Sequence, residues 1–169
     1  MNMKEVIRMA ETVTIKSAQV FPPDTNYYGT LFGGKLMAHI DDVASISATR
    51  FARTPTVTAS TDSVDFIRPI KVGDTVTLKA MVTHTGRSSM EVFVRVTSEN
   101  LITGAEEVAA ISFLTFVALN ENGQPVEVGN VMPESEEEKW LFDTAPARAA
   151  HRKTRKAHSK ELAAFFKKI

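Results

Sequence analysis

The sequence predicts an α+β domain in which one long buried helix packs against a curved antiparallel sheet. Two observations carry this prediction. Residues 33–52 place apolar side chains at the three- and four-residue steps of a helix. They are followed by four segments with strand-like composition, joined by short turns. Short turns connect antiparallel neighbours, since parallel pairs need long crossovers, so the helix must cover an antiparallel sheet.

The first two predicted elements are a strand and the long helix. Residues 11–20 alternate loosely between apolar and polar side chains and predict a strand, which Pro22 and Pro23 end. A loop then runs to about Phe32. In the helix at 33–52, so many positions are small or apolar that most of its circumference should be buried.

The remaining strands follow in close succession. Segments 56–67, 75–85 and 90–98 are rich in Thr and Val or alternate in hydrophobicity, with turns at 72–74 and 86–89. Residues 108–119 form a nearly continuous apolar run, which predicts a strand at the centre of the sheet.

Beyond Pro133 the sequence changes character. Residues 134–140 predict a short helix, and Pro146 predicts the start of a second helix that continues to the end. Residues 146–169 hold eight of the 20 lysines and arginines but only one acidic residue, Glu161. The chain therefore divides into a domain at 9–125 and a C-terminal helical extension at 126–169 that is basic at its end.

The composition excludes several classes of protein. The chain has no cysteine, which excludes disulfides, thiolate metal sites, iron–sulfur clusters and a cysteine nucleophile. No run approaches the roughly 18 apolar residues of a membrane helix, and residues 1–8 lack the features of a signal peptide. We therefore expect a cytoplasmic protein without a membrane partner.

Residues 24–35 hold the densest group of unusual side chains. Gly29, Gly34 and Lys35 imitate the spacing of a phosphate-binding loop, but Leu36 cannot bind magnesium and no buried strand precedes the motif. Glycines at a helix start also leave backbone N–H groups accessible, which suits an oxyanion hole. The alternative is a tight loop entry where the backbone needs positive φ.

Asp41 lies two turns into the predicted helix, on the flank of its apolar stripe. Asp42 is rotated about 100° further round and should face elsewhere. A partly buried carboxylate can act as a general base or a nucleophile, although a solvated helix acid is the commoner case. The sequence contains no Gly-x-Ser-x-Gly elbow, and His39 shows no zinc-binding spacing, so we expect no metal.

Two other segments suit anions. Arg87 with Ser88 and Ser89 can bind phosphate, although residues 86–89 are first a hairpin turn. The basic tail lacks a nucleic-acid motif and interleaved aromatics, so no nucleic-acid partner is expected. A solvated basic helix is the default interpretation, and a contact with the phosphates of a ligand is the second.

Several ordered blocks resemble the acyl-CoA thioesterases of the hotdog superfamily, in particular the YciA-like and cytosolic acyl-CoA hydrolase group. They are 24–29, Phe32-Gly33-Gly34, 37–41, 65–70 with 72–74, 86–89 and 116–119, and together they span about residues 10–125. The resemblance implies a long helix wrapped by an antiparallel sheet, paired as a double-hotdog dimer. It also implies trimers of dimers, an acyl-CoA substrate, an active site at the dimer interface and no metal or cofactor.

The resemblance further implies site residues. Asp41 matches the catalytic carboxylate, and Asn26 matches a loop asparagine that holds the thioester or water. Backbone N–H groups at Gly33 and Gly34 polarise the carbonyl, and the CoA side is lined by Arg68, Arg87, Ser88 and Ser89. Asp41 either activates water or attacks to form an anhydride. Two alternatives are a hotdog hydratase or dehydratase and a non-catalytic acyl-CoA-binding subunit.

Overall fold

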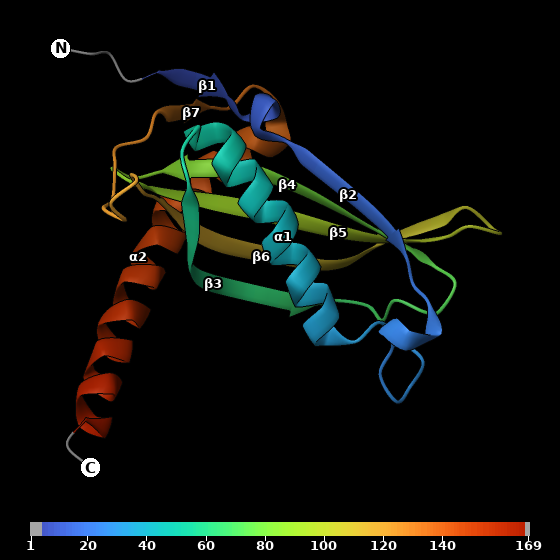
Figure 1. Ribbon diagram of the computed structural model, residues 1–169. Helices are drawn as coiled ribbons and strands as arrows, with labels where there is room; N and C mark the ends of the chain where they lie inside the picture. Colours follow the sequence, from blue (N-terminus) through green and yellow to red (C-terminus); the bar gives the residue numbers. More distant parts are fainter. Residues whose placement is uncertain (1–4, 168–169) are drawn as a thin grey trace.

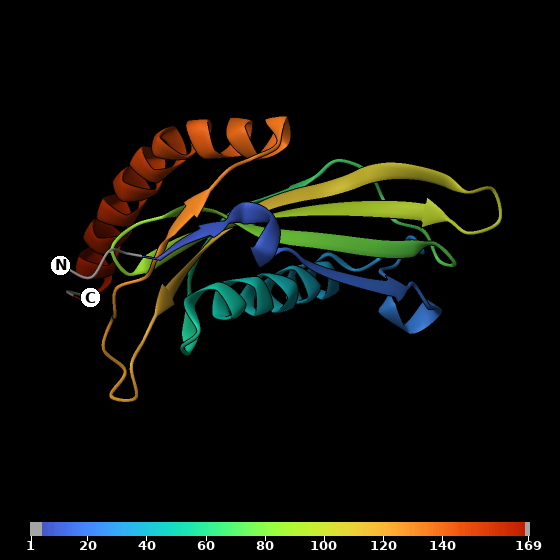
Figure 2. The same ribbon diagram turned by 90° about the horizontal axis from the view of Figure 1, so that it is seen from above.

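The computed structural model describes residues 5–167. Outside the described residues lie 1–4 and 168–169. The first range is part of the N-terminal segment that lacks signal-peptide features, and the second includes the last lysine of the basic tail. A five-stranded antiparallel sheet has the order β2 (Thr14–Gln19), β4 (Thr75–Thr85), β5 (Ser89–Asn100), β6 (Ala105–Ala118) and β3 (Thr56–Phe66). Helix α1 (Gly33–Ala52) covers one face of this sheet, and α2 (Glu136–Phe166) lies on the other face (Figures 1 and 2).

Helix α1 has the predicted bounds because its periodic pattern is local. Seven of its side chains are buried against the sheet: Leu36, Ile40, Val43, Ala44, Ser47, Ala48 and Phe51. The helix ends at Arg53, which adopts the left-handed conformation with φ 54°. The predicted α+β arrangement of one long helix and an antiparallel sheet is thus confirmed.

The prediction that 108–119 lies at the centre of the sheet is wrong. Strand β5 is central, and β6 lies between β5 and the edge strand β3. A nearly continuous apolar run requires burial on both faces, and β6 obtains this burial as an internal strand covered by a helix on each side. Strand β3 is irregular, with register shifts between Thr58 and Ser60 and between Thr61 and Ser63.

Four short elements near the chain ends and the first loop were not predicted. Strand β1 (Val6–Arg8) pairs in parallel with β7 (Asn130–Met132), and 3-10 turns occupy Met9–Thr12 (η1) and Pro22–Asp24 (η2). The predicted strand at 11–20 therefore starts later, at Thr14. The buried Thr12 turns inward instead, and its Oγ1 accepts a hydrogen bond of 2.9 Å from the Val82 N–H.

The prediction of two C-terminal helices is also wrong, because α2 is continuous and contains Pro146. Ser135 caps its start and forms a capping box with Glu138. Proline removes one helical hydrogen bond, and Figure 2 shows that the helix changes direction along its length. Arg148 stabilises the helix around Pro146, because its Nη2 donates a hydrogen bond of 2.6 Å to the Leu141 carbonyl.

Buried ion pairs hold α2 against the sheet. The Glu91 side chain on β5 is 0% exposed, and Arg148 donates to it from Nη2 at 2.8 Å and from Nε at 3.1 Å. Arg152 reaches Asp62 on β3 at 3.1 Å and Glu91 at 3.5 Å, and Arg155 also pairs with Asp62. The expectation of a solvated basic helix is therefore wrong for Arg148 and Arg152, whose side chains are mostly buried, and correct for the exposed residues 156–166; Arg155 is exposed but ion-paired.

The first segment of the extension and α2 therefore contact the domain closely. The division of the chain at residue 125 stays a prediction. Among residues 5–167, no helix is long and apolar enough to cross a membrane.

Candidate active site

Helix α1 and the edge strand β3 lie against each other along their lengths. A side chain on Gly33 would begin 3.5 Å from the Phe66 ring, at the start of the helix and the end of the strand. At the other end, the hydroxyls of Thr49 and Thr56 are 2.7 Å apart. Because helix and strand run in opposite directions, Asp41 in the middle of α1 faces the first half of β3.

Asp41 is half-buried and is oriented by β3. The Thr58 hydroxyl donates a hydrogen bond of 2.8 Å to Asp41 Oδ1. Oδ2 accepts no hydrogen bond from any of residues 5–167, so it is free to take a proton or attack a carbonyl. Asp42 is exposed and pairs with Lys16 on β2, on a different side of the helix, as the helical geometry predicts.

Asn26 closes the loop that precedes α1. Its Oδ1 accepts from the N–H of Tyr28 at 2.9 Å and from the N–H of Thr30 at 3.3 Å. Its Nδ2 donates to Thr30 Oγ1 at 2.9 Å. An amide nitrogen has two donors, so one N–H of Asn26 remains for a ligand.

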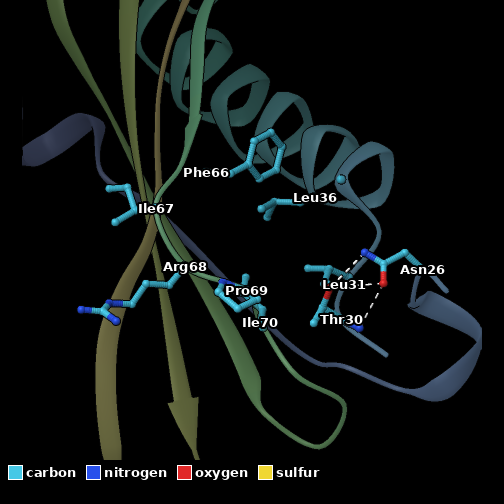
Figure 3. A pocket seen from close by; sticks show the side chains of 10 residues that line it. Asn26, Thr30, Leu31, Leu36, Phe66, Ile67, Arg68, Pro69 and Ile70 are labelled. Atoms are coloured by element: carbon cyan, nitrogen blue, oxygen red, sulfur yellow. Dashed lines mark hydrogen bonds between the residues drawn. The ribbon is translucent and has the colours of Figure 1, made fainter. Parts of the chain in front are cut away.

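A cavity of about 390 Å³ adjoins this loop (Figure 3). It brings together Asn26, the helix start at Gly33 and the end of β3. Its other walls are mostly apolar, formed by Thr30, Leu31, Leu36, Phe66, Ile67, Arg68, Pro69 and Ile70. Figure 3 shows the Arg68 guanidinium directed away from Asn26, and its Nε lies 3.4 Å from Glu107.

The helix start has the properties of an anion site. Phe32 at the N-cap provides no side-chain cap, so the N–H groups of the first turn remain without a partner within residues 5–167. Neither Gly33 nor Gly34 has positive φ, which excludes the alternative that the backbone conformation requires them. A Cβ on Gly34 would lie 2.6 Å from the Phe32 ring, so a side chain there would force that exposed ring to move.

The loop is tied to the helix by an ion pair. Lys35 Nζ lies 2.7 Å from Asp24 Oδ1, and the Phe32 N–H donates to the Asp24 carbonyl at 2.9 Å. The hydrogen bond from Lys35, supported by the Phe21 N–H, lowers the pKa of Asp24 below its ordinary value. Asp24 therefore stays charged at neutral pH and holds the Asn26 loop beside the helix.

The structure does not bring all predicted CoA-binding residues together within one subunit. Arg68 follows the end of β3, where Phe66 pairs with Ala110 of β6. Ser89 pairs with Val117 at the other end of β6, and Arg87 and Ser88 precede it. The predicted roles of Arg68, Arg87, Ser88 and Ser89 toward one ligand stay a prediction.

Sequence reasoning missed Thr58. Its segment is rich in Thr and Ser, and no spacing marks this residue among them. Only the packing of α1 on β3 reveals that Thr58 contacts Asp41. Residues 5–167 contain no group of three or more His, Asp or Glu arranged to hold a metal ion.

Comparison with known proteins identifies the family. Residues 28–105 match the family model described as the thioesterase superfamily. The chain is 60% identical over 153 residues to an uncharacterized acyl-CoA thioester hydrolase of Bacillus subtilis, covering 90% of this chain and 89% of that protein.

Two solved structures are similar over nearly the whole chain. An acyl-CoA hydrolase of Staphylococcus aureus, solved with butyryl-CoA and CoA, is 47% identical with a TM-score of 0.93 and covers 96% of this chain and 99% of its own. Variants of that enzyme, with an aspartate, an asparagine or a threonine replaced by alanine, have also been solved. A hexameric acyl-CoA thioesterase is 50% identical with a TM-score of 0.88, and the match covers 90% of this chain and 98% of that one. Sequence and fold agree: this chain belongs to the thioesterase superfamily and has its hotdog fold.

Proposed function

We propose that this protein hydrolyses the thioester bond of acyl-CoA, releasing CoA and a carboxylic acid, with Asp41 as base or nucleophile. The observation that carries the proposal is the Asp41 carboxylate, oriented by Thr58 and with one oxygen free. Two of the most similar proteins are named for this activity, and one has been solved with butyryl-CoA.

The Staphylococcus aureus variants support these residue roles. In that enzyme the replaced asparagine, aspartate and threonine follow one another at intervals of 15 and 17 residues. Asn26, Asp41 and Thr58 have the same residue types, order and intervals. We therefore assign Thr58 to the site together with Asn26 and Asp41.

The complete site requires a second subunit. Asp41 does not line the cavity that contains Asn26 and Gly33. Strand β3 is an edge strand of 11 residues, and Val57, Phe66 and Ile67 on or beside it are each about half exposed. An unpaired edge of this kind suits pairing with a second copy. We propose a β3-to-β3 dimer that joins Asp41 of one subunit to the loop and helix start of the other.

Two similar solved structures are hexameric thioesterases, and we propose that this chain also forms a hexamer, as a trimer of the β3-to-β3 dimers. The chain carries no cysteine that an oxidising compartment would oxidise, which fits a cytoplasmic location.

The chemistry follows from these groups. The thioester oxygen accepts hydrogen bonds from the free N–H groups at Gly33 and Gly34, which stabilise the negative charge that forms on it. In the base route, Asp41 takes a proton from water while the water oxygen attacks the carbonyl carbon. In the nucleophile route, the Asp41 oxygen attacks and forms an anhydride, which water then hydrolyses. In both routes the carbon–sulfur bond breaks and CoA leaves as its thiolate, with no metal or redox cofactor required.

The hydratase or dehydratase alternative has no observation in its favour. Such an enzyme needs a histidine near the acyl group. His39 lies on α1 outside the cavity, and burial lowers its pKa, while His84 lies beneath α2 next to Phe142.

The test is thiol release from a panel of acyl-CoAs, from acetyl to palmitoyl. Asp41→Asn should lower kcat by about a hundredfold or more, since acid–base groups contribute on that scale. Thr58→Val should cost roughly 10- to 100-fold, because a hydrogen bond to a charged group is worth about 1.5–3 kcal/mol. Asp42→Asn, one residue away and facing Lys16, is the matched control and should keep its activity.

The same assay can refute the proposal. If the wild type releases no thiol from any ester yet binds CoA esters, the protein is a binding subunit. If Asp41→Asn and Asp42→Asn behave alike, the assignment of Asp41 is wrong. Label found in Asp41 after single-turnover hydrolysis in water labelled with heavy oxygen would identify the anhydride route, because water attack at the Asp41 carbonyl of the anhydride leaves its oxygen there.

A further inference from the structure

The Asn26 side chain lies on an exposed loop, yet its amide has one defined orientation. Its Oδ1 accepts hydrogen bonds from the backbone N–H of Tyr28 at 2.9 Å and from that of Thr30 at 3.3 Å, and the amide nitrogen could accept from neither. These two donors occupy both lone pairs of the amide oxygen. Asn26 therefore meets a ligand in the cavity as a hydrogen-bond donor, through the outer N–H of Nδ2.

The Thr30 hydroxyl contacts both ends of this amide (Figure 3). Its Oγ1 accepts from Asn26 Nδ2 at 2.9 Å and donates to Asn26 Oδ1 at 3.2 Å. Among residues 5–167, no other side chain hydrogen-bonds to the Asn26 amide. The last torsion of a free asparagine side chain is broad, so contacts at both ends of the planar group are needed to fix its rotation.

Thr30 is held more firmly than Asn26. Its backbone forms a bridge with Lys71, and the N–H of the next residue, Leu31, donates to the Ile70 carbonyl at 2.8 Å. Leu31 and Ile70 are 9% and 3% exposed and belong to the hydrophobic core. A β-branched residue also has few side-chain conformations. The Thr30 hydroxyl is therefore fixed relative to the cavity, and it transmits this position to the exposed amide.

The direction of the Asn26 N–H matters because of what else lines the cavity. The helix start at Gly33 lines the same cavity and has free backbone N–H groups. An oxygen that gains negative charge during a reaction is stabilised best by donors already aimed at it, because they need no reorganisation when the charge forms. An amide free to rotate would lose this advantage.

We propose that Thr30 is a positioning residue, whose hydroxyl holds the Asn26 amide so that its outer N–H points at the thioester oxygen. This inference rests on the proposed function, in which the helix start binds the same oxygen. The loop itself does not depend on the hydroxyl. The Asn26 N–H donates to the Thr30 carbonyl at 2.8 Å, and the Gly29 N–H donates to the Asn26 carbonyl at 3.1 Å.

The first test is Thr30→Val, which keeps the shape of the side chain and removes its hydroxyl. The kcat for acyl-CoA should fall about two- to twelvefold, the range of one neutral hydrogen bond, with little change in KM, because the interaction strengthens in the transition state. Thr30→Ser keeps the hydroxyl and should restore most of the activity. Thr25→Val is the matched control and should keep the wild-type kcat, because the Thr25 hydroxyl donates to the Pro22 carbonyl and not to Asn26.

A double-mutant cycle shows whether Thr30 acts through Asn26. In the Asn26→Ala background, Thr30→Val should have almost no further effect on kcat, because the group that it positions is gone. A purely structural role of Thr30 would lower kcat by the same factor in both backgrounds. Equal factors, or a wild-type kcat in Thr30→Val, overturn the proposal.

Solvent exchange of the Asn26 side-chain amide protons, followed by NMR on the isotope-labelled full chain, needs no turnover. The proton bonded to Thr30 should exchange about two- to twelvefold faster in Thr30→Val than in the wild type, and Thr25→Val should leave its rate unchanged. Equal exchange in Thr30→Val and the wild type overturns the positioning by Thr30. Faster exchange in a protein that hydrolyses no ester supports the positioning of the amide and removes only the proposed function.

Discussion

Replacing Arg148 by methionine should strongly destabilise the fold. Arg148 makes contacts of 2.8 and 3.1 Å with the Glu91 carboxylate, whose side chain is 0% exposed. It also donates to the Leu141 carbonyl at 2.6 Å and stacks 4.2 Å from the centre of the Phe113 ring. Methionine keeps much of the apolar packing but leaves a buried carboxylate without its main partner.

The magnitude follows from the remaining contacts. Breaking a buried ion pair by removing one partner costs about 3–5 kcal/mol. Thr83 still donates to Glu91 at 2.8 Å and Arg152 lies 3.5 Å away, so we expect the lower end, about 3 kcal/mol. For a chain of this length that corresponds to a fall in Tm of roughly 6–12 °C.

A second substitution tests the physical reason. In Arg148→Met/Glu91→Gln the buried charge is gone, and the glutamine oxygen can still accept from Thr83. The double variant should therefore be more stable than Arg148→Met alone, by about 1 kcal/mol or more. Simple loss of packing predicts the opposite, since each change would add to the cost.

The assay is urea unfolding at one fixed protein concentration, because oligomer formation changes apparent stability. Trp140, the single tryptophan of the chain, lies on α2 and reports on this helix by fluorescence, and far-ultraviolet circular dichroism reports on the whole fold. A loss below about 1 kcal/mol for Arg148→Met, or a double variant less stable than the single one, would refute the reasoning.

Three further predictions follow from contacts elsewhere. Thr12→Val should lower the free energy of unfolding by about 1–3 kcal/mol, measured in urea, because it leaves the buried Val82 N–H without its acceptor; Thr12→Ser, which keeps the hydroxyl, is the control. Burial raises the pKa of Asp62, but hydrogen bonds from Ser60, Thr115 and Arg155 outweigh it, so the pKa in the fold lies below its ordinary value. The charged form thus stabilises the fold above about pH 4, and the stability gap between wild type and Asp62→Asn should shrink as pH falls below that value, in urea titrations at several pH values; a gap independent of pH contradicts this. Lys35→Ala breaks an exposed ion pair and should change stability by less than about 1 kcal/mol, yet lower kcat/KM for acyl-CoA because the Asn26 loop is no longer tied to α1; an unchanged kcat/KM would show that the tie is dispensable.

The sequence alone determined the elements whose signals are local. Helix α1 has its predicted bounds because apolar and small residues recur at helical steps between Gly33 and Ala52. Strand β4 spans residues 75–85 as predicted, because alternation and a glycine turn mark its start. Ordered blocks along the chain also pointed to the hotdog superfamily, which the comparisons confirm, whereas the roles of Asp41 and Asn26 stay a proposal.

Only the tertiary structure decided the contacts between distant segments. Thr58 lies 17 residues from Asp41, Arg148 lies 57 residues from Glu91, and Arg155 lies 93 residues from Asp62. Nothing in a local pattern distinguishes these side chains from other polar residues on strands or on a basic helix. The same contacts explain why α2 continues past Pro146, where local propensity predicts a break. The arginines that neutralise Glu91 and Asp62 reach both carboxylates from one continuous helix across the sheet. Periodicity along a chain determines which face of an element is apolar, whereas the partner of a buried charge is determined only when the layers pack.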